Sequence, residues 1–161
     1  MPETEPKRMP FSPALVPKVL DGTKTVTRRC HRTPRYKVGD IICISERWQH
    51  EDTSCDDPQC GNPYHIYYHA TDPAPETVAR WRPSILQPVW ACRPWRGRII
   101  DVRQERLWNI DDEDAEREGV EPGNAAVYFR ELWNSINGRR QGYAWKDNPQ
   151  VIRYEWEPVN V

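Results

Sequence analysis

The chain has 161 residues, a length typical of one domain, and its eight Trp and seven Tyr can fill a core although only 37% of the residues are hydrophobic. The net charge of −1 excludes a global positive field of the kind that holds a long nucleic-acid backbone. No apolar run reaches the roughly 20 residues that span a bilayer, and the five cysteines have spacings atypical of a secreted disulfide scaffold. We therefore expect a cytoplasmic monomer with reduced thiols and no membrane partner.

The first predicted features are a loose tail and a short helix. Residues 1–10 hold three prolines and few apolar side chains, so we expect a flexible tail followed by one domain over residues 11–161. Ser12 is suited to cap a helix whose apolar positions lie within residues 15–20, and Gly22 is suited to end it.

Four strands are predicted from apolar or alternating patterns. They span residues 41–47, 65–69, 98–106 and 151–157. The first is rich in isoleucine on both faces and is expected to be mostly buried. In the last, Ile152, Tyr154 and Trp156 alternate with charged residues, which predicts a half-exposed strand.

Two further helices are predicted between the last two strands. An acidic helix spans residues 111–118 and stops at Gly119, and a longer one spans about residues 125–136. The apolar stripe expected on the longer helix consists of Val127, Leu132, Trp133 and Ile136. Residues 51–63 and 139–149 are loop-like. Strands and helices that do not alternate regularly predict an α+β fold, arranged as a small barrel with helices at its rim.

Lys24 and Thr27 form the first candidate catalytic pair. A threonine hydroxyl needs an adjacent base to act as a nucleophile at neutral pH, and a desolvated lysine can lose its proton and serve as that base. Residues three apart face opposite sides of a regular strand, so these two side chains can meet only if the backbone between them turns or bulges. The alternative is an exposed lysine beside strand-forming threonines.

Glu118 is the next candidate, at the C-terminal end of the acidic helix. The helix dipole disfavours a carboxylate there by roughly 0.3–1 kcal/mol, and a nearby cation would relieve this cost. The alternative is a solvated acid in an acidic run.

Arginine and tryptophan occur together in residues 81–84 and 93–98, and a basic cluster spans residues 28–35. Tryptophan can stack on a base while arginine contacts phosphate, so these segments indicate a nucleotide-type ligand. The alternative is surface arginine balanced by acidic residues.

A possible zinc site comprises Cys55, Cys60, His65 and His69. The spacing lacks the twelve-residue separation of zinc fingers, but the two histidines would share one face of the strand predicted at residues 65–69. The alternative is loop thiols and strand imidazoles.

The ordered motifs of the chain resemble the ASCH family, particularly its bacterial and phage-type members, over nearly the whole length after the tail. The matching segments are Leu20-Asp21-Gly22-Thr23-Lys24-Thr25-Val26-Thr27-Arg28-Arg29, Tyr36-x-x-Gly39-Asp40, Glu46-Arg47-Trp48, Trp81-Arg82-Pro83-Ser84-Ile85, Glu105-Arg106-Leu107, Leu132-Trp133 and Trp145-x-x-Asn148-Pro149. The resemblance implies a small PUA-like β-barrel with flanking helices and a cleft for nucleosides or RNA.

Some ASCH members are amidohydrolases that remove the acetyl group of N(4)-acetylcytidine with a threonine, a lysine and a glutamate. By motif position these match Thr27 as nucleophile, Lys24 as general base and Glu118 as the residue that orients the lysine. The implied substrate is a small nucleoside, with no metal or cofactor. The expected substrate contacts are Arg28, Glu46, Trp81, Arg82 and Ser84.

Other members of the family bind RNA or are described as ribonucleases. The alternative is therefore a module that binds RNA or a modified nucleoside without amidase activity, in which Lys24 and Arg28 contact phosphate or sugar and Thr27 is structural. Residues 51–94 are additional relative to small amidohydrolase members. They would add a wall or lid and admit bulkier acyl groups.

Overall fold

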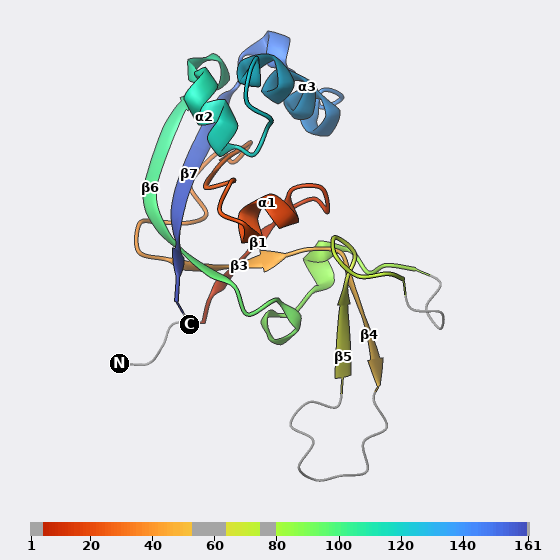
Figure 1. The fold of residues 1–161 in the computed structure, drawn as a ribbon. Helices are drawn as coiled ribbons and strands as arrows, with labels where there is room; N and C mark the ends of the chain where they lie inside the picture. Colours follow the sequence, from red (N-terminus) through yellow and green to blue (C-terminus); the bar gives the residue numbers. More distant parts are fainter. Residues whose placement is uncertain (1–4, 53–63, 75–79, 161) are drawn as a thin grey trace.

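The computed structural model describes residues 5–52, 64–74 and 80–160. Its strands are β1 (Lys7–Pro10), β2 (Val26–Arg29), β3 (Ile41–Ser45), β4 (Trp48–Asp52), β5 (Tyr64–Tyr68), β6 (Arg96–Arg106) and β7 (Gln150–Val159). Its α-helices are α1 (Val16–Leu20), α2 (Asp112–Arg117) and α3 (Ala125–Asn137). Long, curved β6 and β7 lie side by side, with α2 and α3 together at one end and α1 inside the curve (Figure 1). This arrangement confirms the predicted α+β class.

Five strands form one sheet in the order β1-β3-β6-β7-β2, and β4 pairs with β5 in a separate hairpin. β1 and β3 are parallel, and the other neighbours are antiparallel. In the described part of the chain β1 and β2 remain at opposite edges with no ladder between them, so the sheet is open. The predicted closed barrel is therefore not confirmed. The two longest strands curve, with a register shift between Ile99 and Asp101, but they do not bring the edges together.

The predicted flexible tail is wrong for residues 7–10, which form β1. Met9 is completely buried in the core, and this strand pairs along its whole length with β3. The Arg8 guanidinium donates to the carbonyl oxygens of Ile85 and Gln87, at 3.0 and 2.6 Å. One apolar side chain and contacts to distant residues fix this segment, whereas its composition alone predicts disorder.

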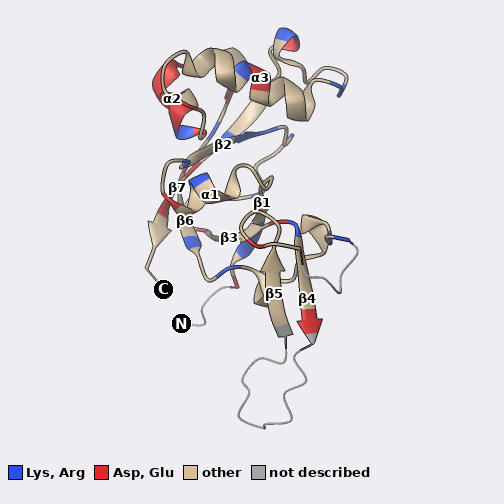
Figure 2. Cartoon of the chain, turned by 45° about the vertical axis from the view of Figure 1, so that its right-hand side comes forward, with Lys and Arg blue, Asp and Glu red and all other residues tan. Residues whose placement is uncertain are grey.

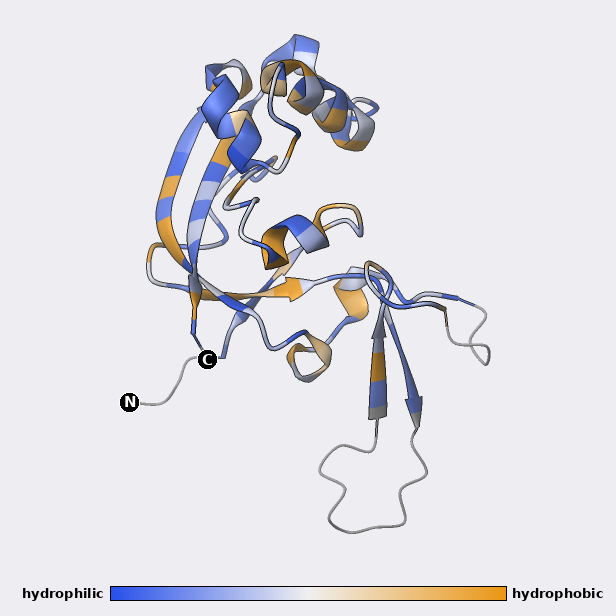
Figure 3. Ribbon diagram, in the orientation of Figure 1, coloured by the Kyte–Doolittle hydropathy of each residue, from blue (hydrophilic) through white to orange (hydrophobic). Residues whose placement is uncertain are grey.

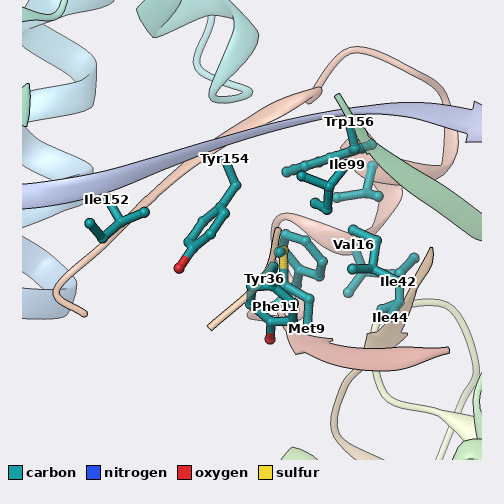
Figure 4. Packing of buried hydrophobic residues seen from close by; sticks show 11 residues of the cluster. Met9, Phe11, Val16, Tyr36, Ile42, Ile44, Ile99, Ile152, Tyr154 and Trp156 are labelled. Carbon is teal, nitrogen blue, oxygen red and sulfur yellow. The ribbon is translucent and has the colours of Figure 1, made fainter. Parts of the chain in front are cut away.

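Two hydrophobic clusters make up the core. The first joins β1, α1, β3, β6 and β7 and is drawn in Figure 4; it contains Met9, Phe11, Val16, Val19, Tyr36, Ile42, Ile44, Ile99, Ile152, Tyr154 and Trp156. The second joins α2 and α3 to the beginning of β7 and contains Leu107, Ile110, Ala115, Val120, Ala125, Phe129, Trp133 and Val151. Both clusters contain side chains of β7, and this strand therefore connects them.

α1 is shorter than predicted, and Ser12 does not cap it. The helix begins at Val16, and the Ser12 carbonyl oxygen accepts the N–H groups of Leu15 and Val16 across a preceding turn. Pro17 lies in the first turn of the helix, where its missing N–H costs no hydrogen bond. Gly22 follows the helix with φ +85°, as expected of a terminating glycine.

The apolar stripe predicted for α3 is partly wrong. The buried positions are Ala125, Phe129, Trp133 and Asn137, spaced four apart, and these pack on the second cluster. Val127 and Ile136 are 54% and 58% exposed. Burial selects the face turned to the sheet, which the order of apolar residues along the helix did not identify.

β7 is buried on both faces over residues 151–154, so the predicted half-exposed strand is also wrong there. β7 lies between β6 and β2, and the first cluster covers one of its faces. On the other face the buried Arg153 guanidinium binds the Asp114 carboxylate of α2 at 2.9 and 2.8 Å. An alternating pattern identifies an exposed face only when nothing charged packs against it.

The β4–β5 hairpin projects away from the sheet and is more hydrophilic than β3 (Figure 3). β5 confirms the strand predicted over residues 65–69, whereas Glu51 and Asp52, predicted as loop, belong to β4. Within the described ranges, no helix is both long and apolar enough to cross a bilayer.

Candidate active site

A cleft of about 630 Å³ lies between the two hydrophobic clusters. Its walls are the segment that leads into α1, strand β2 with the loop after it, and the C-terminal half of α3. Aromatic side chains from both clusters face it, and the predicted catalytic residues Lys24, Thr27 and Glu118 all line it. The volume is in the range of sites for small organic ligands.

Lys24 lies in the irregular segment between α1 and β2, where its N–H donates to the Lys18 carbonyl oxygen at 2.9 Å. It is only 1% exposed. Its Nζ donates to the Val26 carbonyl at 2.7 Å, and to the Glu118 carbonyl and carboxylate at 2.8 and 3.0 Å. The alternative of an exposed lysine is therefore wrong.

Burial and the ion pair act in opposite directions on the pKa of Lys24. Loss of water lowers this pKa, the Glu118 carboxylate raises it, and the effect of burial is the larger, so the pKa lies below the ordinary lysine value. The ammonium has an acceptor for each hydrogen, yet its neutral form is more accessible than that of a lysine in water. A buried general base needs this balance.

Glu118 occupies the C-cap position of α2 and is 3% exposed. One of its carboxylate oxygens accepts from Lys24 at 3.0 Å, and the other accepts from Arg28 at 3.0 Å. These cations neutralise a carboxylate that the helix end would otherwise disfavour. The alternative of a solvated acid is therefore wrong, and Glu118 is fixed on both oxygens beside Lys24.

Gly119 brings Glu118 to this position by ending α2 with φ +102°. A Cβ atom at residue 119 would lie 3.3 Å from the Cβ of Lys24 and 3.3 Å from the Cδ of Lys18. Both the backbone conformation and the close approach of Lys24 thus favour glycine here.

Thr27 lies in β2 opposite Tyr154 of β7 and is 4% exposed. Its Oγ1 accepts a hydrogen bond from Arg29 Nε at 3.2 Å. Among the described contacts none joins Thr27 Oγ1 to Lys24 Nζ, whose hydrogens point to other acceptors. Lys24 lies in the irregular segment before β2, whereas Thr27 lies within β2. The two residues are therefore not in one regular strand, as a contact between their side chains would require.

Arg28 lines the cleft, but carboxylates occupy its guanidinium. It binds Glu105 at 2.9 Å, Glu118 at 3.0 Å, and Asp114. We expected a substrate contact. The structure instead gives Arg28 a positioning role, because it fixes the Glu118 carboxylate from the side opposite Lys24.

Of the other predicted substrate contacts, Ser84 lines the cleft and Glu46 does not. The Ser84 carbonyl oxygen accepts from the Ser45 hydroxyl at 2.6 Å, which ties it to β3. Glu46 is completely buried, and Arg93 donates to its two carboxylate oxygens at 2.7 and 3.1 Å. Both oxygens of the Glu46 carboxylate are thus occupied by Arg93 inside the protein.

Trp81 and Arg82 also lie outside the set of residues that line the cleft. A β-bridge between Arg82 and Trp48 holds this segment against β4, and the Arg82 guanidinium lies 5.4 Å from the centre of the Trp48 ring. The Trp81 ring packs against His69 at 4.9 Å between ring centres. The Trp-Arg pairing is therefore used within the protein, and it was a misleading signal for ligand contact.

Half of the predicted zinc ligands, Cys55 and Cys60, lie outside the described residues. His65 packs on the ring of Tyr67 at 4.5 Å between centres, and His69 packs on Trp81. In residues 5–52, 64–74 and 80–160 no three metal-binding side chains converge. The zinc hypothesis stays a prediction.

His31 lines the cleft and is held by Tyr154. The Tyr154 hydroxyl accepts from the Arg35 N–H at 3.0 Å and is hydrogen-bonded to His31 Nδ1 at 2.8 Å. Burial, with the charges of Arg35 and Arg29, lowers the pKa of His31 to about 4. The ring is therefore neutral at pH 7.

Sequence reasoning missed the contribution of α3 and of two arginines, Arg47 and Arg140, to the cleft. The basic loop after α3 was a signal for Arg140. Arg47 belongs to the Glu46-Arg47-Trp48 segment, but that motif did not indicate that its side chain lines the cleft. It does so because β3 ends beside the segment that leads into α1, where the Phe11 N–H donates to the Ser45 carbonyl oxygen at 2.9 Å.

The fold has a counterpart among solved structures, although no family model and no curated protein matches the sequence. The chain is similar to the crystal structure of protein EF3133 from Enterococcus faecalis V583, of family model DUF984, with 12% sequence identity and a TM-score of 0.54. The match covers 99% of this chain and 83% of that chain. At this identity the likeness supports the fold alone.

Proposed function

We propose that the cleft is the active site of an amidohydrolase that removes acyl groups from N(4)-acylated cytosine nucleosides. The observation that carries the proposal is the buried pair of Lys24 and Glu118, whose side chains are 2% and 4% exposed, in the same cleft as the hydroxyl of Thr27. Titratable groups with perturbed proton affinity, gathered in a cleft with a potential nucleophile, are typical of catalytic sites.

In the proposed reaction, Thr27 Oγ1 attacks the acyl carbonyl carbon and its proton passes to the neutral amine of Lys24. The tetrahedral intermediate collapses when the Lys24 ammonium protonates the exocyclic N4, which leaves as the amine of cytosine. Water then attacks the acyl-threonine ester while Lys24 takes its proton. Lys24 returns this proton to Thr27 Oγ1 as the carboxylic acid leaves, which regenerates the free hydroxyl and the neutral amine.

Glu118 and Arg29 prepare the two reacting groups. When Lys24 loses its proton, Nζ keeps two hydrogens for its three acceptors, so one side of the nitrogen becomes free to accept. Glu118 keeps the nitrogen in place through this change. Arg29 donates to Thr27 Oγ1, which orients the hydroxyl and stabilises negative charge that develops on its oxygen.

The remaining lining suits a flat heteroaromatic ligand. Phe11, Phe129 and Trp133 offer apolar surface on both sides of the cleft, and the neutral imidazole of His31 can form a hydrogen bond with a polar group of the base. The resemblance to ASCH amidohydrolases supports the same assignment. Under this proposal the protein is a cytoplasmic monomer with a small-molecule substrate.

The test uses N(4)-acetylcytidine and bulkier N(4)-acylcytidines, with the release of cytidine followed by chromatography. Thr27→Val keeps the shape of the side chain but removes the hydroxyl, and we expect kcat to fall by at least about 10³-fold. Thr27→Ser should retain part of the activity. The matched control is Thr25→Val, two residues earlier and outside the cleft, which should leave kcat within about twofold of wild type.

Lys24→Gln and Glu118→Gln extend the test to the other two residues. A catalytic set predicts that each abolishes turnover while binding of cytidine, measured by calorimetry, changes little. A module that only binds RNA or a modified nucleoside predicts a graded loss of affinity instead. No release of cytidine from any acyl compound, by wild-type protein with a cooperative unfolding transition, would refute the enzyme proposal.

A further inference from the structure

The cleft concentrates positive charge on a chain whose net charge is −1. Six cationic side chains line it, against the single carboxylate of Glu118. The cationic residues are Lys24, Arg28, Arg29, Arg35, Arg47 and Arg140. Acidic residues gather on α2, and basic residues lie on neighbouring β2 (Figure 2). A low-dielectric cleft lined by one sign of charge attracts ligands of the opposite sign.

Three of these cations are already engaged inside the protein. Lys24 and Arg28 are paired with carboxylates. Arg29 donates to Thr27 Oγ1 at 3.2 Å and to the Pro10 carbonyl oxygen at 2.5 Å. These interactions belong to the fold and to the proposed catalytic residues, so none of these three cations is free to bind a ligand.

The other three, which we call the rim arginines, are Arg35, Arg47 and Arg140. All three are exposed, and none forms an ion pair with any carboxylate in the part of the chain that the structure describes. Elsewhere the buried arginines and several surface ones have acidic partners. Other exposed arginines of the described chain, such as Arg130, also lack an acidic partner, so the distinguishing feature of the rim arginines is that all three line one cleft.

The backbone of each rim arginine is anchored, which sets where its guanidinium can reach. The N–H of Arg35 donates to the Tyr154 hydroxyl at 3.0 Å, and the carbonyl of Arg47 accepts from the His69 N–H at 3.0 Å. The N–H of Arg140 donates to the Asn137 carbonyl at 3.0 Å, and its guanidinium lies 4.6 Å from the ring centre of Tyr143. Three separate segments thus present a cation to one opening.

We propose that the rim arginines bind phosphate, and that the natural ligand is a nucleotide rather than an uncharged nucleoside. The base enters between the aromatic walls toward Lys24, and the phosphate stays at the opening. Arginine is suited to this role, because its planar fork of N–H donors matches two phosphate oxygens at once. The proposal rests on the proposed function for the acyl group on the base, but the phosphate contact can be tested without it.

The experiment compares kcat/KM for N(4)-acetylcytidine, its 5′-monophosphate, and the same base within a short RNA oligonucleotide, at about 20 mM and 200 mM salt. We expect one or both phosphorylated forms to be preferred, and the preference to shrink at high salt because exposed charges are screened. A preference for the monophosphate identifies a mononucleotide ligand. A preference for the oligonucleotide alone assigns the contact to strand phosphates.

Variants connect the preference to the named residues. Arg35→Ala, Arg47→Ala and Arg140→Ala should each reduce the ratio of kcat/KM between phosphorylated and unphosphorylated substrate by about three- to fivefold. Lysine at the same positions should restore part of the ratio. The control is Arg130→Ala, which removes an exposed arginine of α3 that has no ion pair among the described residues and does not line the cleft, and should leave the ratio unchanged.

The outcomes separate this inference from the proposed function. If all three substrates are hydrolysed equally well, or if the rim variants behave as Arg130→Ala does, the phosphate rim is refuted and the amidohydrolase stands. If none is hydrolysed, calorimetry with cytidine and cytidine 5′-monophosphate replaces kinetics. Tighter binding of the monophosphate that the rim variants abolish would support the rim alone, and equal or absent binding would overturn it.

Discussion

The buried ion pair of Lys24 and Glu118 is the central chemical feature at the scale of single residues. Burial favours neutral lysine and the carboxylate at 3.0 Å favours ammonium, and the effect of burial is the larger. Arg28 donates to the other oxygen of Glu118, and its positive charge weakens the attraction of that carboxylate for the proton of Lys24. In the proposed reaction, Arg28 would therefore support Lys24 as the general base.

His31 is expected to make the stability of the protein depend on pH between 6.5 and about 4. In that window the unfolded chain binds a proton on this imidazole and the folded protein does not, so the free energy of unfolding falls as the pH falls. His31→Gln should flatten this part of a pH series of urea unfolding curves. The direct measurement is NMR titration of the imidazole, and a midpoint near 6.5 would contradict the prediction.

The position of α2 is decided at the scale of elements. The helix has six residues, which is too short to be stable alone. It is capped by Asp111, whose side chain accepts from the Asp114 N–H at 2.8 Å, and it is held on the sheet by Asp114, which binds Arg153 of β7 and Arg28 of β2. The ion pairs therefore place Glu118, at the end of the helix, over the cleft.

Asp114→Asn tests this anchor. Burial alone would raise the pKa of Asp114, but hydrogen bonds from Arg153 and Arg28 outweigh it and keep the pKa below 3.8. The charged carboxylate thus stabilises the fold above pH 3.8, and this contribution is lost as the pH falls further. We expect the variant to lose about 2–3 kcal/mol at pH 7 by urea unfolding.

The difference between Asp114→Asn and wild type should shrink below pH 3.8, because protonated aspartic acid resembles asparagine. A difference that stays constant down to pH 2 would show that charge is not the cause. Arg103→Ala removes exposed pairs at 3.7 and 3.6 Å and is the control, with an expected cost below about 1 kcal/mol.

Gly119→Ala tests the junction between α2 and the site. The positive φ should cost about 1–2 kcal/mol of stability, and the new Cβ would press on the Lys24 side chain, so turnover should fall as well. Gly39→Ala is the matched control, since its φ is +93° and nothing lies within 4 Å of its added Cβ. Equal loss of turnover in both variants would show that crowding of Lys24 is unimportant.

For the whole molecule, the arrangement of two cores along one strand creates the cleft. β7 carries Ile152, Tyr154 and Trp156 into the first cluster and Val151 into the second. α1 packs with one cluster and α3 with the other, so the space between the two helices is lined from both sides and cannot be filled by either. β1 contributes the buried Met9 to the first cluster.

Met9→Ala tests the contribution of β1. Because Met9 is completely buried, we expect the free energy of unfolding to fall by about 3 kcal/mol, measured by urea or thermal unfolding. Lys7→Ala is the control within the same strand. Its side chain is 47% exposed and pairs with Asp40 at 2.6 Å, so it should cost less than about 1 kcal/mol. A loss below about 0.5 kcal/mol for Met9→Ala would indicate that residues 7–10 behave as the flexible tail that composition predicts.

The sequence by itself determined the local features whose causes are local. The α+β class, the acidic helix ending at Gly119, and the strands at β3, β5, β6 and β7 all follow from spacing, capping and glycine conformation. Motif order also selected Lys24, Thr27 and Glu118, which the structure brings to one cleft. Their chemical roles remain a proposal.

Only the tertiary structure decided which charges are buried and which face of each element is covered. Arg28, Arg153 and Glu46 have the composition of surface residues, yet partners far away in the chain bury them. The rim arginines look the same in the sequence and remain unpaired. Period and propensity describe a residue and its neighbours within one element, whereas pairing depends on which elements meet, and this is settled by the packing of β7 between the two cores.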